Sequence, residues 1–193
     1  MTDFEFVFIL YGLILGLSLA AILSGLGRAL EFEFATDASA KDSDFVIGSL
    51  TPLMAVFVML DLMSFWMFAW AVRNYIEVNP PTLVSVAAFA SGYFLTARLV
   101  FPERPETFKN LNAHYFRTSR TIYGILIAMV VTQWIYLASI SELRNAIFSF
   151  QPIALTLLLI SLMAIAIIWR NRHVQAVILV ALIVRYLVLY FLV

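Results

Sequence analysis

Residues 48–72 read GSLTPLMAVFVMLDLMSFWMFAWAV, and residues 174–193 read VQAVILVALIVRYLVLYFLV. Each run is apolar over about 20 residues, the length that an α-helix needs to cross a hydrocarbon core of roughly 30 Å. Each also holds one charge near its middle, Asp61 in the first and Arg185 in the second. The two runs therefore predict membrane helices with charges at a depth where charges are rare and usually paired or functional.

The composition of the whole chain points the same way. Its 193 residues are 63% hydrophobic and 12% charged, whereas soluble domains carry about a quarter charged residues. The net charge is zero, so we do not expect nucleic acid as a partner. The chain has no cysteine, which excludes disulfides, thiol catalysis and thiolate metal sites.

Six segments are long and apolar enough to be spans. They are about 6–27, 46–72, 82–101, 119–138, 151–168 and 174–193. The acidic residues before the first segment lack the basic region of a secretory signal, so we interpret that segment as a retained helix. Backbone groups in lipid must be satisfied within their own segment. We therefore predict an all-α polytopic membrane protein, a bundle of six transmembrane helices forming one domain over residues 1–193.

Lys and Arg are distributed unevenly between the two ends of the predicted bundle. One end holds nine bases: Arg28, Lys41, Arg98, Arg104, Lys109, Arg117, Arg120, Arg170 and Arg172. The other end holds Arg73 and Arg144. Because Lys and Arg collect in cytoplasmic connections, we predict that both termini are non-cytoplasmic.

Two longer connections lie at the basic end. Residues 28–45 are predominantly acidic, and residues 98–120 carry five bases against Glu103 and Glu106. The sequence leaves two interpretations open. The connections are separate solvated loops, or they pair through their opposite charges, which contributes only about 0–1 kcal/mol for each exposed ion pair.

Small residues form a stripe along the first span. Gly12, Gly16, Ala20 and Ser24 recur at four-residue steps and share one helix face. In lipid, small residues let helices approach closely. The stripe is predicted to pack either within the protomer or at the seam of a homo-oligomer.

The two intramembrane charges are predicted to meet. Asp61 lies about 22 Å along its helix and Arg185 about 17 Å along a parallel one. Arg185 requires a counter-charge or water, and Asp61 is the only acid deep in a span. Three interpretations stay open: a structural pair, an element of a conduction pathway, or an oligomer contact.

Polar residues in other spans extend the hypothesis. Tyr11, Ser64, Tyr93, Thr132 and Gln133 are each compatible with a pathway or with an ordinary bond between helices. We select Tyr11 and Gln133 as the candidates for pathway lining.

The basic edge offers further candidates. Lys109, Arg117 and Arg120 are predicted to contact anionic lipid headgroups, although simple anchoring explains the same pattern. His114 and His173 are expected to be solvated at this edge, with haem ligation or pH sensing as the alternatives.

Motifs of hydrolases, P-loop proteins and dinucleotide-binding enzymes are missing from the sequence. No histidine lies deep in a span beside a nucleophile. We therefore expect no catalytic residues, no metal and no cofactor.

The segment FEFVFILYGLILGLSLAAILSGLGRALE at 4–31, the Trp-rich second span and YFRTSRTIYGI at 115–125 resemble a group of small bacterial six-helix inner-membrane proteins. The resemblance is carried mainly by the first span. It implies a multi-pass protein of the bacterial inner membrane and transfers no activity or site.

These observations favour a small channel or transporter that passes protons, ions or a small solute, assembled as a homo-oligomer. The alternative is a non-transporting membrane subunit or adaptor whose cytoplasmic loops bind a partner protein. The lipid bilayer is the one partner that the composition itself requires.

Overall fold

The computed structural model describes residues 3–39 and 45–192 of the chain. Within these residues, six helices are long and apolar enough to cross a membrane. They are α1 (Asp3–Ser39), α2 (Leu50–Ala71), α3 (Pro80–Val100), α4 (Leu111–Ser139), α6 (Phe150–Ile168) and α7 (Arg172–Leu192). The predicted all-helical class is confirmed, and so is the presence of six helices with the length and apolar composition of membrane spans. The shorter elements are η1 (Arg73–Tyr75), η2 (Pro105–Thr107) and α5 (Ser141–Ile147).

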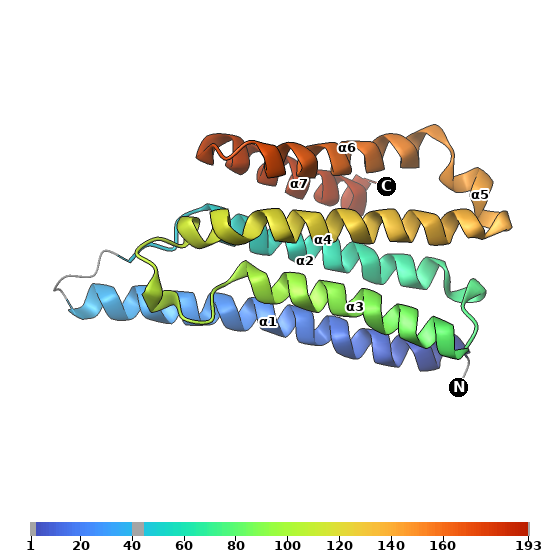
Figure 1. Ribbon diagram of the computed structural model, residues 1–193, viewed down its shortest axis with the longest axis horizontal. Coiled ribbons are helices and arrows are strands. Elements are labelled where there is room, and N and C mark those ends of the chain that lie inside the picture. The colour runs from blue at the N-terminus through green and yellow to red at the C-terminus, as the bar shows by residue number, and fades with distance from the viewer. Residues whose placement is uncertain (1–2, 40–44, 193) are drawn as a thin grey trace.

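The long helices run roughly parallel or antiparallel to one another (Figure 1). Helix α2 lies centrally, in contact with α1, α3, α4 and α7. Helices α1 and α3 pack along one side of it, and α6 and α7 pack together on the other. The first residues of α1 and the last of α7 lie at the same end of the bundle, as do α5 and the α2–α3 connection. A charged side chain on a buried face of α2 therefore lies in the middle of the bundle, surrounded by other helices.

Helix α1 is longer than the sequence pattern predicted. It continues through most of the segment 28–45, which we expected to be a loop, and ends at Ser39. No Pro interrupts residues 28–39, and Ala, Leu and Glu within them favour helix. At 1.5 Å per residue, α1 is about 55 Å long, well beyond a hydrocarbon core of about 30 Å.

Helix α4 also begins earlier than predicted, at Leu111 instead of residue 119. The reason is a local cap: the side-chain oxygen of Asn110 accepts a hydrogen bond from the backbone N–H of Asn112 at 2.8 Å. Asn is among the preferred capping residues, and polar residues of the first two turns stay helical behind it.

The two connections at this end pack together through their backbones. Val46 and Asn110 form a parallel bridge, in which the N–H of Val46 donates to the carbonyl of Lys109 and the N–H of Leu111 to that of Val46. Glu33 of α1 also accepts a bond from the N–H of Ile47 at 3.3 Å. The expectation of two separate solvated loops is therefore wrong for residues 45–47, where the contact is backbone pairing. The charged side chains of residues 36–44 lie outside those that the structure describes, so pairing through their charges stays a prediction.

The same junction caps α2 from a distant part of the chain. The side-chain oxygen of Asn112 accepts from the N–H of Leu50 at 3.2 Å, and Thr51 donates to the carbonyl of Leu111. Gly48 precedes this cap with φ of 70°, and a Cβ there would lie 2.6 Å from the amide of Asn112. Only glycine combines this backbone conformation with so close an approach.

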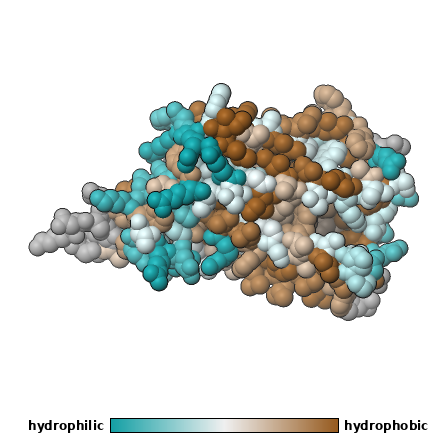
Figure 2. All heavy atoms as spheres, viewed as in Figure 1, coloured by the Kyte–Doolittle hydropathy of each residue, from teal (hydrophilic) through white to brown (hydrophobic). Residues whose placement is uncertain are grey.

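The surface follows the arrangement of the helices. Figure 2 shows hydrophilic residues gathered around the end that carries the α1–α2 and α3–α4 connections, and hydrophobic residues over the middle of the bundle. This distribution is typical of a multi-pass membrane protein, whose helices face lipid in the middle and water at their ends.

Candidate functional site

Asp61 lies on the face of α2 that is buried in the bundle. Met54, Phe57, Val58 and Phe65 share this face at spacings of three and four residues, and all are buried. Asp61 itself is 4% exposed. The helical period thus places one carboxyl group inside an otherwise apolar row.

Two tyrosines from other helices hold this carboxyl group. The hydroxyl of Tyr93 on α3 donates to Oδ2 of Asp61 at 2.9 Å, and the hydroxyl of Tyr186 on α7 donates to Oδ1. Both tyrosines are buried. Each carboxyl oxygen therefore has a phenol partner, and one side chain joins three helices. We call Asp61, Tyr93 and Tyr186 the Asp61 cluster.

Arg185 is not the direct partner that the sequence suggested. Its Nε donates to the carbonyl of Leu155 on α6 at 3.2 Å, and its guanidinium carbon lies 4.9 Å from the ring centre of Tyr186. Consecutive helical residues point about 100° apart, so only one of the pair 185 and 186 faces Asp61. Tyr186 takes that position, and Arg185 turns towards α6. The predicted contact between the second and sixth spans exists, but Tyr186 makes it.

No protein-family model, curated protein or solved structure matches this chain.

Two polar atoms close to this region are buried without a partner among the described residues. One is Nη1 of Arg185 and the other is the hydroxyl of Tyr11. Tyr11 on α1 packs against Phe65 with ring centres 5.1 Å apart, and Phe65 packs against Tyr93 at 5.2 Å. Tyr11 thus lies behind the Asp61 cluster, with Phe65 between it and Tyr93, and its role in lining a pathway stays a prediction. A buried donor without a partner costs free energy, so both atoms mark places where a polar species would be stabilised.

Gln133, the second candidate for pathway lining, lies elsewhere. It is half-buried on α4, and its side chain makes no hydrogen bond within the part of the chain that the structure describes. Thr132 donates to the carbonyl of Ala128 on its own helix. Neither residue extends the Asp61 cluster.

A second buried polar group lies nearer the end with the α6–α7 turn. Gln175 on α7 donates to the carbonyls of Ala166 and Trp169 at 2.6 and 2.5 Å. Its oxygen accepts from the hydroxyl of Tyr115 at 2.5 Å, and that hydroxyl lies 3.1 Å from the hydroxyl of Tyr123. We call Gln175, Tyr115 and Tyr123 the Gln175 cluster. It closes the α6–α7 turn and fastens it to α4.

Phe57 separates the two clusters. Its fully buried ring lies 6.2 Å from the ring of Tyr123 and 6.2 Å from that of Tyr186, measured between ring centres. The two polar clusters therefore follow one another along the interior of the bundle, with a single aromatic ring between them.

The small-residue stripe on α1 is mostly outside the protomer core. Gly16, Ala20 and Ser24 are exposed, and only Gly12 approaches another helix, at Trp66. The expectation that the stripe packs within the protomer is wrong for these three residues. The close approach on α1 occurs instead at Gly25, where a Cβ would lie 2.6 Å from Cβ of Phe101.

The basic candidates lie at the surface. Arg120 donates to the carbonyl of Ile167 at 3.0 Å, Arg117 lies over the ring of Phe108 at 5.3 Å, and Lys109 is exposed. Contact with anionic lipid stays a prediction for all three. Among the described residues, no group of three or more His, Asp or Glu side chains comes together to hold a metal ion.

One histidine differs from its prediction. His114 is buried, with Nε2 3.1 Å from the carbonyl of Leu99, so it is not solvated. It lies on the α4 turn that we had placed in a loop. His173 is exposed, as expected.

The sequence analysis named Tyr93 but missed Tyr186 and the whole Gln175 cluster. Tyrosine is common at membrane–water interfaces, so a tyrosine in an apolar helix is readily interpreted as an interfacial anchor instead of a buried hydrogen-bond donor. The available signal was helical spacing: Gln175, Leu179, Leu182 and Tyr186 fall on one face of α7, and all are buried.

Proposed function

We propose that this chain carries protons across the membrane, as a channel or as a proton-coupled transporter, with Asp61 as the proton-binding group. The observation that carries the proposal is a buried carboxyl group bonded to two phenol hydroxyls from different helices. Ionisable groups inside membrane bundles are rare and costly, and they mark proton relays and ion pathways.

The chemistry of the cluster suits protons better than larger species. A phenol hydroxyl donates and accepts hydrogen bonds, and a carboxyl group accepts or releases a proton. A proton can pass between such groups after a small rotation, without an open pore. Asp61 is closed off in this conformation, which argues against free passage of a hydrated ion through it.

The Gln175 cluster supports a path towards one end of the bundle. The hydroxyls of Tyr115 and Tyr123 lie on one side of Phe57, and the Asp61 cluster lies on the other side. The ring of Phe57 therefore interrupts the row of polar groups through the bundle. Such an arrangement conducts only when the ring of Phe57 moves or when water passes it. The structure thus corresponds to a closed state in this proposal.

We assign the end with the α1–α2 and α3–α4 connections to the cytoplasm, and both termini to the other side. The bias of nine bases to two supports this orientation under the positive-inside rule.

We assign the protein to a bacterial inner membrane on the resemblance alone. Exposed Gly16, Ala20 and Ser24 support self-association, because small residues on an outer face permit close helix contact.

The second candidate function is that of a non-transporting subunit or adaptor. It is favoured by the last turns of α1, which extend past the length that a bilayer needs. Phe34 in these turns is 66% exposed. An exposed aromatic residue on a protruding helix supports contact with a cytoplasmic protein partner.

The decisive experiment compares Asp61→Asn with the native chain in liposomes that contain a pH-sensitive dye. We expect proton flux under an imposed gradient in the native protein and its loss in the variant. Gln133→Leu is the matched control, since it removes a polar side chain from a span, and that side chain bonds to neither cluster. No proton flux in the native protein under any gradient, with both samples folded, would favour the adaptor.

A further inference from the structure

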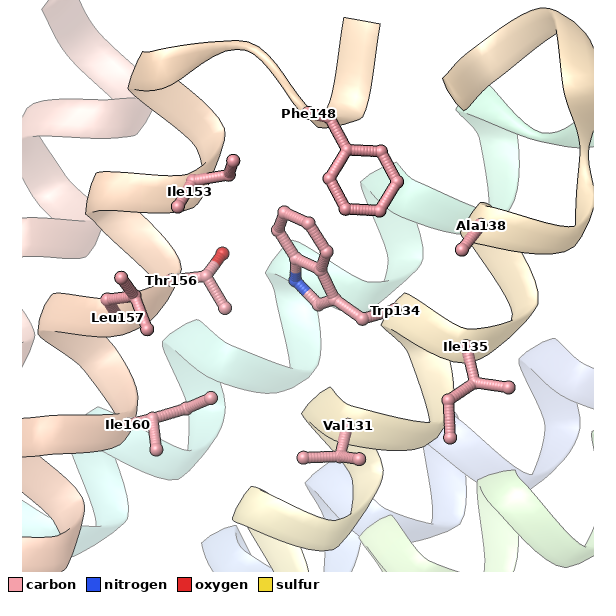
Figure 3. Close-up of a pocket in the computed structure, with 9 residues that line it drawn as sticks. All are labelled: Val131, Trp134, Ile135, Ala138, Phe148, Ile153, Thr156, Leu157 and Ile160. Atoms are coloured by element: carbon pink, nitrogen blue, oxygen red, sulfur yellow. The ribbon is translucent and has the colours of Figure 1, made fainter. Parts of the chain in front are cut away.

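An apolar groove opens between α4, α6 and the connection from α5 to α6, at the end of the bundle where α1 begins. Its volume is about 320 Å³, within the range of sites that hold small molecules. Figure 3 shows Trp134 of α4 pointing into it, with Phe148 above and Thr156 of α6 opposite. The remaining lining residues are Val131, Ile135, Ala138, Ile153, Leu157 and Ile160.

The walls of the groove face the surroundings of the bundle, not its core. Val131, Ile135 and Leu157 are exposed, and so is Phe148 at the upper rim. Val131 and Ala138 are seven residues apart, so the groove follows α4 for about 10 Å. In a bilayer, this surface meets hydrocarbon chains.

Arg144 lies beside the groove. Arg144 of α5 donates through Nε and Nη2 to the carbonyl of Ala138, at 3.3 and 3.1 Å, and Ala138 lines the groove. These bonds fix the guanidinium beside the end of α4. Arg144 is exposed, so its group also faces the membrane surface.

We propose that this groove binds an anionic phospholipid, with an acyl chain between α4 and α6 and the phosphate on Arg144. The apolar walls match the chain, and the positive charge beside the groove matches the headgroup. The position of Arg144 at a helix end, where the apolar lining stops, matches the boundary between chain and headgroup in a lipid. The site lies at the opposite end from Lys109, Arg117 and Arg120.

The test is native mass spectrometry of protein purified in detergent and titrated with phosphatidylglycerol or phosphatidylcholine of the same chains. We expect the native chain to retain phosphatidylglycerol more strongly. Arg144→Gln should weaken that binding about fivefold, as expected for one base near a headgroup, and leave phosphatidylcholine unchanged. Arg73→Gln is the matched control, because Arg73 also donates to a helix-end carbonyl beside a Trp at this end.

A second variant tests the groove itself. Thr156→Phe should fill it and reduce retention of both lipids, with an unchanged unfolding temperature; Ala138→Leu serves if that variant does not fold. Equal retention of both lipids by the native chain would overturn the proposal. So would equal losses in Arg144→Gln and Arg73→Gln. A change of oligomeric state in Thr156→Phe would also overturn it, by assigning the groove to a second copy of the chain.

Discussion

The hydroxyl of Tyr186 donates a hydrogen bond to Oδ1 of Asp61 and so joins α7 to α2 inside the bundle. Asp61 receives a second bond from Tyr93 on α3. The guanidinium of the neighbouring Arg185 lies over the ring of Tyr186, with its carbon 4.9 Å from the ring centre. The carboxyl group is therefore held by phenols, while the guanidinium of Arg185 is bonded to the carbonyl of Leu155 on α6.

This arrangement predicts an uneven pattern of energetic coupling. A double-mutant cycle between Asp61→Asn and Tyr186→Phe should give a coupling free energy of about 0.5–3 kcal/mol, as for residues in direct contact. A cycle between Asp61→Asn and Arg185→Leu should give a smaller value. Reversible unfolding in mixed micelles measures both, and a larger coupling to Arg185 would indicate a direct ion pair.

Phe57 is predicted to limit proton flux if the proposed function holds. Phe57→Ala removes the ring between Tyr123 and Tyr186 and leaves a space that water can enter, so flux in liposomes should rise. Phe57→Leu should give an intermediate value. Phe101→Ala, which removes another buried ring away from this path, is the control, and equal flux in the two alanine variants would contradict the role of Phe57.

Gln175 is predicted to stabilise the α6–α7 turn. Gln175→Leu leaves the carbonyls of Ala166 and Trp169 without their side-chain donor, which should lower the free energy of unfolding by about 1–3 kcal/mol. Gln133→Leu should change it by less than about 0.5 kcal/mol, because no bond is lost. Thermal unfolding in detergent distinguishes the two, and similar midpoints would argue against the inferred network.

Glycines of α1 should respond in opposite ways to the same substitution. Gly25→Ala places a Cβ 2.6 Å from Phe101 and should destabilise the fold by about 1–3 kcal/mol. Gly16→Ala meets no atom within contact distance and should be neutral or stabilising, since Ala favours helix. Parallel unfolding curves provide the measurement, and a penalty at Gly16 in a monomeric preparation would show that its face is occupied.

Self-association is tested at the same exposed stripe. If Gly16, Ala20 and Ser24 form a seam, Gly16→Leu should shift the oligomer towards monomer in detergent, because a large side chain prevents close helix approach. Light scattering coupled to size exclusion gives the mass. An unchanged oligomer would place the seam elsewhere, and a native monomer would remove the need for one.

The sequence by itself determined the helical class and the six helices that are long and apolar enough to cross a membrane. A run of about 20 apolar residues in lipid must be an α-helix, because every backbone N–H and C=O must be paired inside the segment. It also identified Asp61 and Arg185 as the charges that need an explanation, since hydrocarbon penalises charge at any such position. Both conclusions depend on local composition alone.

Only the tertiary structure decided the partners. Residues 185 and 186 differ by about 100° of helix rotation, and the packing of α7 against α2 selects which one meets Asp61. Packing likewise decided which small residue of α1 allows a close approach. Gly25 lies against Phe101, whereas Gly16 has no neighbour within contact distance. Asn112 caps α2 across 62 positions of sequence, a link that no local pattern carries. The apolar runs of the sequence determine which segments are helices of membrane-spanning length. The rotation of each helix about its axis, and its depth relative to its neighbours, depend on packing in the whole bundle. Rotation and depth decide which polar side chains come into contact.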